Sequence, residues 1–134
     1  MNKIDHIGVV VKDINKANQL FETILKTSSY KKEYVKSEDV STSFFKLGDS
    51  KIELISSNDP EHTINKYINN QSSSLHHFAI RVDDIIIEMK RISSLGIRLL
   101  NDTPKFGADN MLICFLHPKD TYGVLIELCQ EINQ

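Results

Sequence analysis

Residues 4–14 read IDHIGVVVKDI, and residues 75–85 read LHHFAIRVDDI. Each stretch begins with a β-branched, apolar run that is typical of a strand. Each then reaches an aspartate followed by isoleucine, which is typical of a helix N-terminus. Aligning the two stretches superposes His6 on His77 and Asp13 on Asp84, with the same separation of 71 residues in both pairs. The sequence therefore predicts a duplication in which each copy opens with a strand and a helix.

A second pair of similar stretches follows the first pair along the sequence. Residues 48–55 (GDSKIELI) resemble residues 122–129 (YGVLIELC), which superposes Glu53 on Glu127 at a separation of 74 residues. The drift from 71 to 74 residues is what a small loop insertion would produce. The duplication therefore extends over nearly the whole chain.

The segments between these repeated stretches complete a strand–helix–strand–strand–strand unit in each copy. Residues 40–47 and 110–117 are apolar enough to supply one more strand each, and a proline at residue 60 predicts the start of a short helix over residues 60–69. The apolar positions of the two main helices are expected at Ile14, Ala17, Leu20, Phe21, Ile24 and Leu25 in the first copy and at Ile85, Met89, Ile92 and Leu95 in the second.

We therefore expect an α+β fold in which two paired βαβββ modules form one domain over residues 1–134 and enclose a metal-containing cleft. Module 1 covers about residues 1–70 and module 2 about residues 75–132, and the polar stretch NNQSSS (69–74) joins them. The repeat is too long for a solenoid, and neither module alone would bury its sheet face well.

The composition excludes several classes of function. A net charge of −2 gives no general attraction to nucleic acid or to a membrane surface. No apolar run approaches the roughly 18 residues of a spanning helix, and the start of the chain lacks the apolar region of a signal peptide. Cys114 and Cys129 lie singly in apolar segments, so we expect buried thiols rather than a disulfide, and a cytoplasmic protein.

Four repeated polar residues are the candidate site. Burying a carboxylate in the middle of an apolar strand costs several kcal/mol unless it is paired or binds a metal. If the two sheets fold over a shared cleft, His6, Glu53, His77 and Glu127 converge as ligands of one divalent ion of octahedral preference, with positions left for water or substrate. The absence of cysteine ligands argues against a structural zinc site.

Each of these residues also has an ordinary structural interpretation. A lone strand histidine is usually packed and hydrogen-bonded, and a lone strand glutamate usually faces solvent. Repetition of all four in register favours the site. His76 points to the opposite strand face from His77, while His62 and His117 have no counterpart in the other copy, so none of the three is expected to bind metal.

The same residues carry a resemblance to a known family. IDHIGVVVKDI, LHHFAIRVDDI and FLHPKDTYGVLIELCQ (115–130) resemble the corresponding motifs of the vicinal-oxygen-chelate superfamily, which includes the glyoxalases, bleomycin-resistance proteins and dioxygenases. The likeness is greatest to the methylmalonyl-CoA epimerases and covers nearly the whole chain. The LHPK stretch is the most specific part, because many superfamily members share the other motifs without it.

The resemblance implies an isomerase that inverts C2 of methylmalonyl-CoA by removing one proton and returning another. It implies one divalent ion (Co, Ni, Zn or Mn) on His6, Glu53, His77 and Glu127, a coenzyme A thioester as partner, and a homodimer. Glu127 would be one catalytic base and Glu53 the other. Lys105, Gly107 and Lys119 are candidate substrate-binding residues, with the two lysines near the phosphates.

The chain departs from the family pattern in two places. Some epimerases carry a second, non-ligand glutamate where this chain has VSTSFF (40–45). Either Glu53 serves as the second base while also binding the metal, or Glu38 or Asp39 takes that role, or the substrate is a different one. The loop FGADN (106–110), expected to overhang the cleft, has less glycine than is usual.

The main alternative is glyoxalase I (lactoylglutathione lyase), which uses the same ligand geometry and also moves a proton next to a carbonyl. A metal-free drug-sequestering protein needs no ligand set. An extradiol dioxygenase needs two histidines and one carboxylate, generally in a longer chain. Both of these rank below the two isomerising enzymes.

Overall fold

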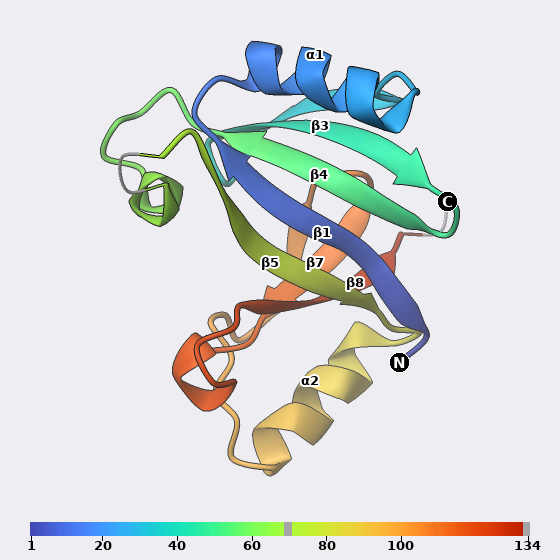
Figure 1. Ribbon diagram of the computed structural model, residues 1–134. Coiled ribbons are helices and arrows are strands. Elements are labelled where there is room, and N and C mark those ends of the chain that lie inside the picture. The colour runs from blue at the N-terminus through green and yellow to red at the C-terminus, as the bar shows by residue number, and fades with distance from the viewer. Residues whose placement is uncertain (69–70, 133–134) are drawn as a thin grey trace. The chain divides into compact units, whose positions relative to one another are not determined.

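The computed structural model of the protein describes residues 1–68 and 71–132 (Figure 1). Its elements occur in a duplicated order. The first set comprises β1 (Lys3–Val11), α1 (Ile14–Leu25), β2 (Lys31–Val35), β3 (Val40–Leu47) and β4 (Ser50–Ser56). The second set comprises β5 (Ser73–Arg81), α2 (Ile85–Ser94), β6 (Lys105–Gly107), β7 (Met111–Phe115) and β8 (Ile126–Glu131). The expected α+β class and the βαβββ order of both modules are confirmed.

The chain divides into two compact units, and the start of β1 belongs to the second of them. The first half is His6–His76, and the second half is Met1–Asp5 together with the described residues from His77 onward. The first half also contains the short 3₁₀ helix η1 (Thr63–Tyr67), and the second contains η2 (Pro118–Asp120). Each half is built on its own four-stranded pattern.

In the first half the strands lie in the order β2-β3-β4-β1, antiparallel except for the parallel pair of β1 and β4. Helix α1 covers one face of these strands (Figure 1). Asp13 caps α1 by accepting a hydrogen bond from the backbone of Lys16. The core beneath the helix consists of Val9, Val11, Phe45 and Leu54, with Ile14, Ala17, Phe21, Leu25 and Ile52 packed against it.

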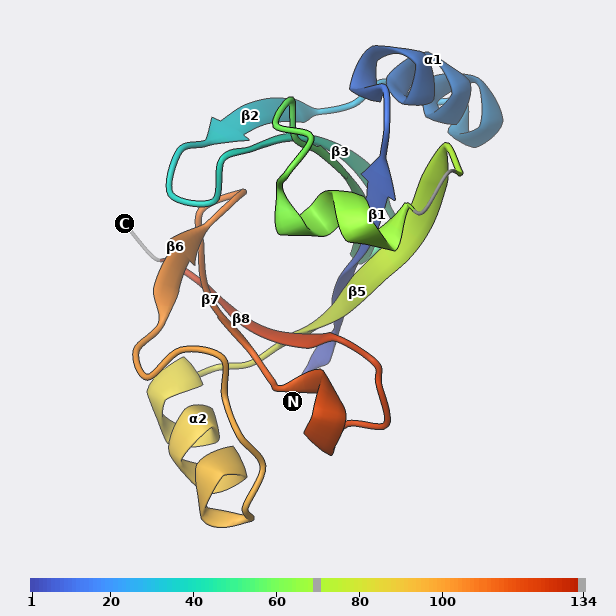
Figure 2. The same ribbon diagram turned by 90° about the vertical axis from the view of Figure 1, so that its left-hand side faces the viewer.

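The second half repeats this arrangement with the order β5-β8-β7-β6, in which β5 and β8 are parallel and the other neighbours antiparallel (Figure 2). Asp84 caps α2 as Asp13 caps α1. Its core consists of Val82, Ile85, Met89, Ile92, Cys114, Leu116 and Leu128. None of the described helices is long and apolar enough to cross a membrane.

Several expected details of the helices were wrong. Leu20 and Ile24 are 56% and 62% exposed, because α1 presents a narrower apolar stripe to the sheet than the spacing suggests. Asn18 is buried there instead, accepting a hydrogen bond from the Ser43 hydroxyl. Leu95 is 63% exposed because α2 ends at Ser94, one residue before it. Gly96 follows with a φ of 83°, as expected of a glycine that ends a helix.

The segments between the strong motifs differ more from expectation. The helix expected over residues 60–69 is the 3₁₀ turn Thr63–Tyr67. The strand expected over residues 110–117 is shorter, Met111–Phe115. Of the expected linker, Ser73 and Ser74 belong to β5, whereas Asn69 and Asn70 lie outside the described residues.

The two cysteines are buried free thiols, as expected. Burial raises the pKa of the Cys114 thiol to about 11, so this side chain stays protonated and unreactive at neutral pH. Cys114 therefore contributes to the core of the second half, and Cys129 packs in a second cluster with Ala79, Met111 and Ile113.

A buried ion pair in the second half was not anticipated from the sequence. Asp5 is completely buried, and Arg81 donates to its Oδ1 from Nε and Nη2 at 2.9 and 2.6 Å. Arg81 also donates to Glu131 at 3.1 Å. The pair joins the first residues of the chain to the end of β5.

We expect Arg81→Met to lower the free energy of unfolding by about 3 kcal/mol, because it leaves the Asp5 carboxylate buried without its cation. Denaturant titration measures the loss. Arg91→Met is the matched control, since Arg91 pairs with Glu88 on the surface of α2 and its removal should cost less than about 1 kcal/mol. Equal losses in the two variants would contradict a structural role for the buried pair.

Candidate active site

The first half places His6 and Glu53 on one face of its sheet. Glu53 on β4 lies opposite Gly8 on β1 and opposite Phe44 on β3. His6 precedes Gly8 by two residues, so strand alternation turns it to the same face as Glu53. His6 Nε2 lies 3.6 Å from Glu53 Oε1, and both residues are buried, with the edge of the His6 ring against Phe44.

The second half reproduces this geometry residue for residue. Glu127 on β8 lies opposite Ala79 on β5 and opposite Phe115 on β7. His77 precedes Ala79 by two residues, and its Nε2 lies 3.6 Å from Glu127 Oε1. The His77 ring packs edge-on against Phe115 at 5.4 Å between centroids. Each half therefore brings one imidazole beside one carboxylate.

The two pairs have the composition and spacing of metal ligands. A separation of 3.6 Å is too long for a good hydrogen bond. Two donor atoms that share one divalent ion, each about 2.1 Å from it, are at most about 4.2 Å apart. Buried imidazole and carboxylate groups at this spacing fit a divalent ion of the kind that accepts mixed nitrogen and oxygen ligands.

The other three histidines have structural roles. The His62 ring accepts from the backbone of Ile64 through Nδ1 and bonds the Glu38 carbonyl through Nε2, which fixes η1. His117 accepts from the backbone of Lys119 and caps η2.

His76 packs its ring against Tyr67 at 4.5 Å between centroids. Burial lowers the pKa of His76 to about 4, so it is neutral at physiological pH. The expectation that His76 is a packing residue agrees with this geometry.

The region without a carboxylate, residues 40–45, places Thr42 on the face that carries Glu53. Thr42 is buried, and its hydroxyl donates to the Glu33 carbonyl at 3.0 Å. Asp39 accepts from the Tyr34 hydroxyl at 2.6 Å, and Tyr34 lies opposite Ser41, on the other face of the sheet. This hydrogen bond holds the Asp39 carboxylate away from Glu53, which leaves Glu53 and Glu38 as the candidates for a second base.

The three candidate substrate-binding residues lie on two segments of the second half. Lys105 and Gly107 belong to β6, and Lys119 lies in η2, with both lysines exposed. A Cβ on Gly107 would lie 2.8 Å from Ile113 Cγ2, so this position requires glycine for packing. Their contact with substrate remains a prediction.

The expected overhanging loop is the turn of the β6–β7 hairpin. Asp109 and Asn110 both have a positive φ, 58° and 59°, a conformation that glycine adopts more easily. Aspartate and asparagine are the residues that best replace glycine there, which accounts for the departure from a glycine-rich loop.

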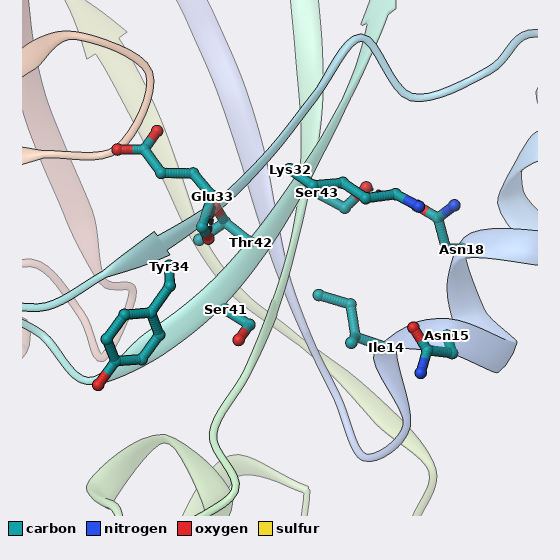
Figure 3. Close-up of a pocket in the computed structure, with 9 residues that line it drawn as sticks. All are labelled: Ile14, Asn15, Asn18, Lys32, Glu33, Tyr34, Ser41, Thr42 and Ser43. Carbon is teal, nitrogen blue, oxygen red and sulfur yellow. Dashed lines mark hydrogen bonds between the residues drawn. The ribbon is translucent and has the colours of Figure 1, made fainter.

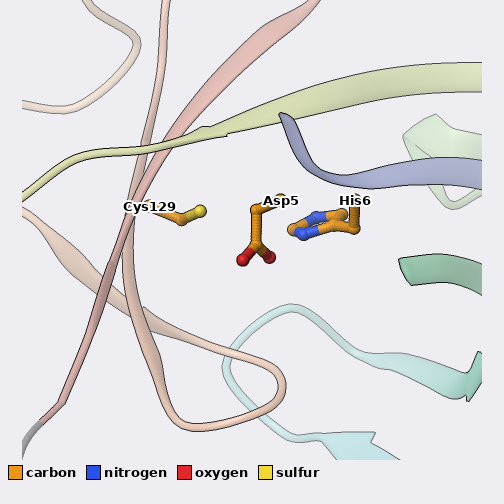
Figure 4. Close-up of side chains that lie close together, drawn as sticks. All are labelled: Asp5, His6 and Cys129. Carbon is orange, nitrogen blue, oxygen red and sulfur yellow. The ribbon is translucent and has the colours of Figure 1, made fainter. Parts of the chain in front are cut away.

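Two further features were missed by sequence reasoning. The Asp5 carboxylate, which pairs with Arg81, lies within 4.8 Å of the Cys129 sulfur. Figure 4 shows Asp5 and Cys129. The argument applied to Glu53, that a carboxylate in an apolar strand needs a partner, would have found Asp5 as well.

A pocket of about 270 Å³ also opens between α1 and the β2–β3 strands, lined by Asn15, Asn18 and Ser43 among others (Figure 3). Ser43 points to the α1 face of the sheet, away from Glu53, whereas Thr42, which shares the Glu53 face, also lines the pocket.

The folding pattern and the site together define the class of protein. The chain belongs to the Glyoxalase/Bleomycin resistance protein/Dioxygenase superfamily, whose family model matches residues 5–115. Methylmalonyl-CoA epimerase of mouse mitochondria is 32% identical over 131 residues, which cover 97% of this chain and 74% of the mouse protein. The uncharacterized protein YqjC of Bacillus subtilis is 31% identical over 97% of this chain and 93% of its own length.

Among solved structures, a variant of Streptomyces coelicolor methylmalonyl-CoA epimerase in complex with 2-nitronate-propionyl-CoA superposes with a TM-score of 0.92. It is 26% identical, and the match covers 99% of each chain. The chain is thus similar over its full length to epimerases of a coenzyme A thioester.

Proposed function

We propose that the protein is a metal-dependent epimerase of methylmalonyl-CoA and that His6, Glu53, His77 and Glu127 bind one divalent ion. The observation that carries the proposal is the duplicated histidine–glutamate pair, with the same 3.6 Å separation in both halves. Full-length similarity to epimerases supports the substrate. When bound, the ion would supply Lewis-acid stabilisation of the negative charge that develops on the thioester oxygen.

Inversion at C2 needs a proton acceptor on each face of a planar enolate. Glu127 removes the C2 proton from one epimer, and Glu53 delivers a proton to the opposite face. Their roles exchange for the other epimer. His6 and His77 lie beside these carboxylates, and the buried Phe44 beside His6 and the partly buried Phe115 beside His77 limit the access of water to the proton-transfer groups.

The proposal predicts exchange of the C2 hydrogen of methylmalonyl-CoA with solvent. The metal-loaded protein in D₂O should incorporate deuterium at C2, measured by mass spectrometry, and should interconvert the two epimers. It should not convert the methylglyoxal–glutathione hemithioacetal at a comparable rate. Conversion of the hemithioacetal without exchange of methylmalonyl-CoA would assign the protein to the glyoxalase I type, with which it shares a two-histidine, two-glutamate set. Inactivity on both would refute the proposal.

A further inference from the structure

Lysines cluster on the face of the first-half sheet that carries Glu53. Lys51 precedes Glu53 by two residues and is the register partner of His6, so all three side chains share that face. Lys51 is half-buried, and its Nζ lies over the Phe44 ring, 5.8 Å from the centroid. Phe44 is itself buried against His6. The Lys51 ammonium is therefore directed along the sheet beside the His6–Glu53 pair.

A second lysine lies directly across from the first. Lys46 on β3 is the antiparallel register partner of Lys51 on β4. Like charges at directly opposite positions of an antiparallel pair destabilise the sheet. Lys31 on β2, opposite Phe44, adds a third cation to this face and pairs with Glu33 at 3.5 Å. Lys46 and Lys51 therefore place two positive charges side by side on the face of the sheet that carries Glu53.

We infer that Lys51, with Lys46 beside it, binds anionic oxygens of the thioester substrate and thereby selects for a charged substrate. This inference rests on the proposed function and names the residues that give it substrate specificity. The oxygens belong either to the acyl carboxylate or to the coenzyme A phosphates. Both are anionic groups that a lysine binds as a point charge.

Titration calorimetry with three probes tests the inference without requiring turnover. Methylmalonyl-CoA carries both kinds of anion, propionyl-CoA only the phosphates, and methylmalonyl-pantetheine only the carboxylate. Lys51→Met should weaken the binding of methylmalonyl-CoA by roughly 10- to 100-fold, as expected for the loss of one charged hydrogen bond. Lys46→Met should give a smaller loss, because Lys46 is exposed. Lys51→Arg should retain most of the affinity.

Lys32→Met is the matched control. Lys32 lies on β2 opposite Ser43 and points to the α1 side of the sheet, so the substitution removes the same charge from the other face (Figure 3). The affinity of the Lys32→Met protein for all three probes should equal that of the wild type.

The pattern across the probes identifies the anion. A loss confined to the two methylmalonyl compounds assigns Lys51 to the carboxylate, and a loss confined to the two coenzyme A compounds assigns it to the phosphates. Unchanged affinity of folded Lys51→Met and Lys46→Met for every probe would overturn the inference. Lys51-dependent binding without deuterium exchange would leave it standing and refute the epimerase proposal. Deuterium exchange, with affinities that neither lysine substitution changes, would overturn the inference about the lysines and leave the epimerase proposal standing.

Discussion

Glu127→Gln is expected to reduce deuterium exchange at C2 of methylmalonyl-CoA by about 1,000-fold. Glutamine has nearly the same shape as glutamate but cannot take up a proton at neutral pH, and the loss of a general base typically costs roughly 10²- to 10⁴-fold in rate. Glu127 is buried on β8, between Ala79 and Phe115 of the neighbouring strands.

The control is Glu131→Gln, four residues further along the same strand. Glu131 is exposed and pairs with Arg81, so the change removes an equal charge at a distance from His77. Its exchange rate should stay within about twofold of the wild type. Metal content is measured in parallel, so that a weakened metal site is distinguished from a missing base. A Glu127→Gln protein that keeps its metal and more than a tenth of the exchange rate would show that Glu127 is not the base.

His77→Ala is expected to weaken metal binding by more than about 100-fold, whereas His76→Ala should keep the wild-type metal content. Substitution of groups that merely orient metal ligands already costs roughly 10- to 100-fold, so loss of a direct ligand should cost at least as much. The two neighbours occupy opposite faces of β5, His77 with Glu127 and His76 with Tyr67.

Elemental analysis after dialysis against metal-free buffer measures this difference. His76→Ala also has a structural cost, because it removes an aromatic pair worth about 0.5–1.5 kcal/mol beyond its buried area. Thermal unfolding should therefore show a modest loss for His76→Ala even though its metal stays bound. If His76→Ala lost the metal and His77→Ala kept it, the proposed ligand set would be wrong.

The repeat explains why much of this fold was predictable. Strand parity around His6 and His77, the caps at Asp13 and Asp84, and the two glutamate strands all depend on local patterns, and duplication allowed each to be checked against its copy. The candidate metal-ligating pair within each half followed from the same alignment.

Other features depend on tertiary contacts that no local pattern records. The edge strand β2 reads KKEYV and has no strong apolar alternation, so it was not located. Leu20 and Ile24 look like core residues from their spacing, but the stripe of α1 that packs against the sheet is narrower than that spacing suggests. The ion pair of Asp5 with Arg81 joins residues far apart in sequence, and only the fold brings them together.

Met1–Asp5 belong to the second half although they precede the first half in the sequence, which limits where the chain can be divided into two folding fragments. A fragment cut at the internal repeat would carry Arg81 without Asp5, and the other fragment would carry the Asp5 carboxylate with no guanidinium to receive it. Met1–Asp5 pack with the second half. Complementation between separately expressed halves would therefore have to bring Asp5 back to Arg81.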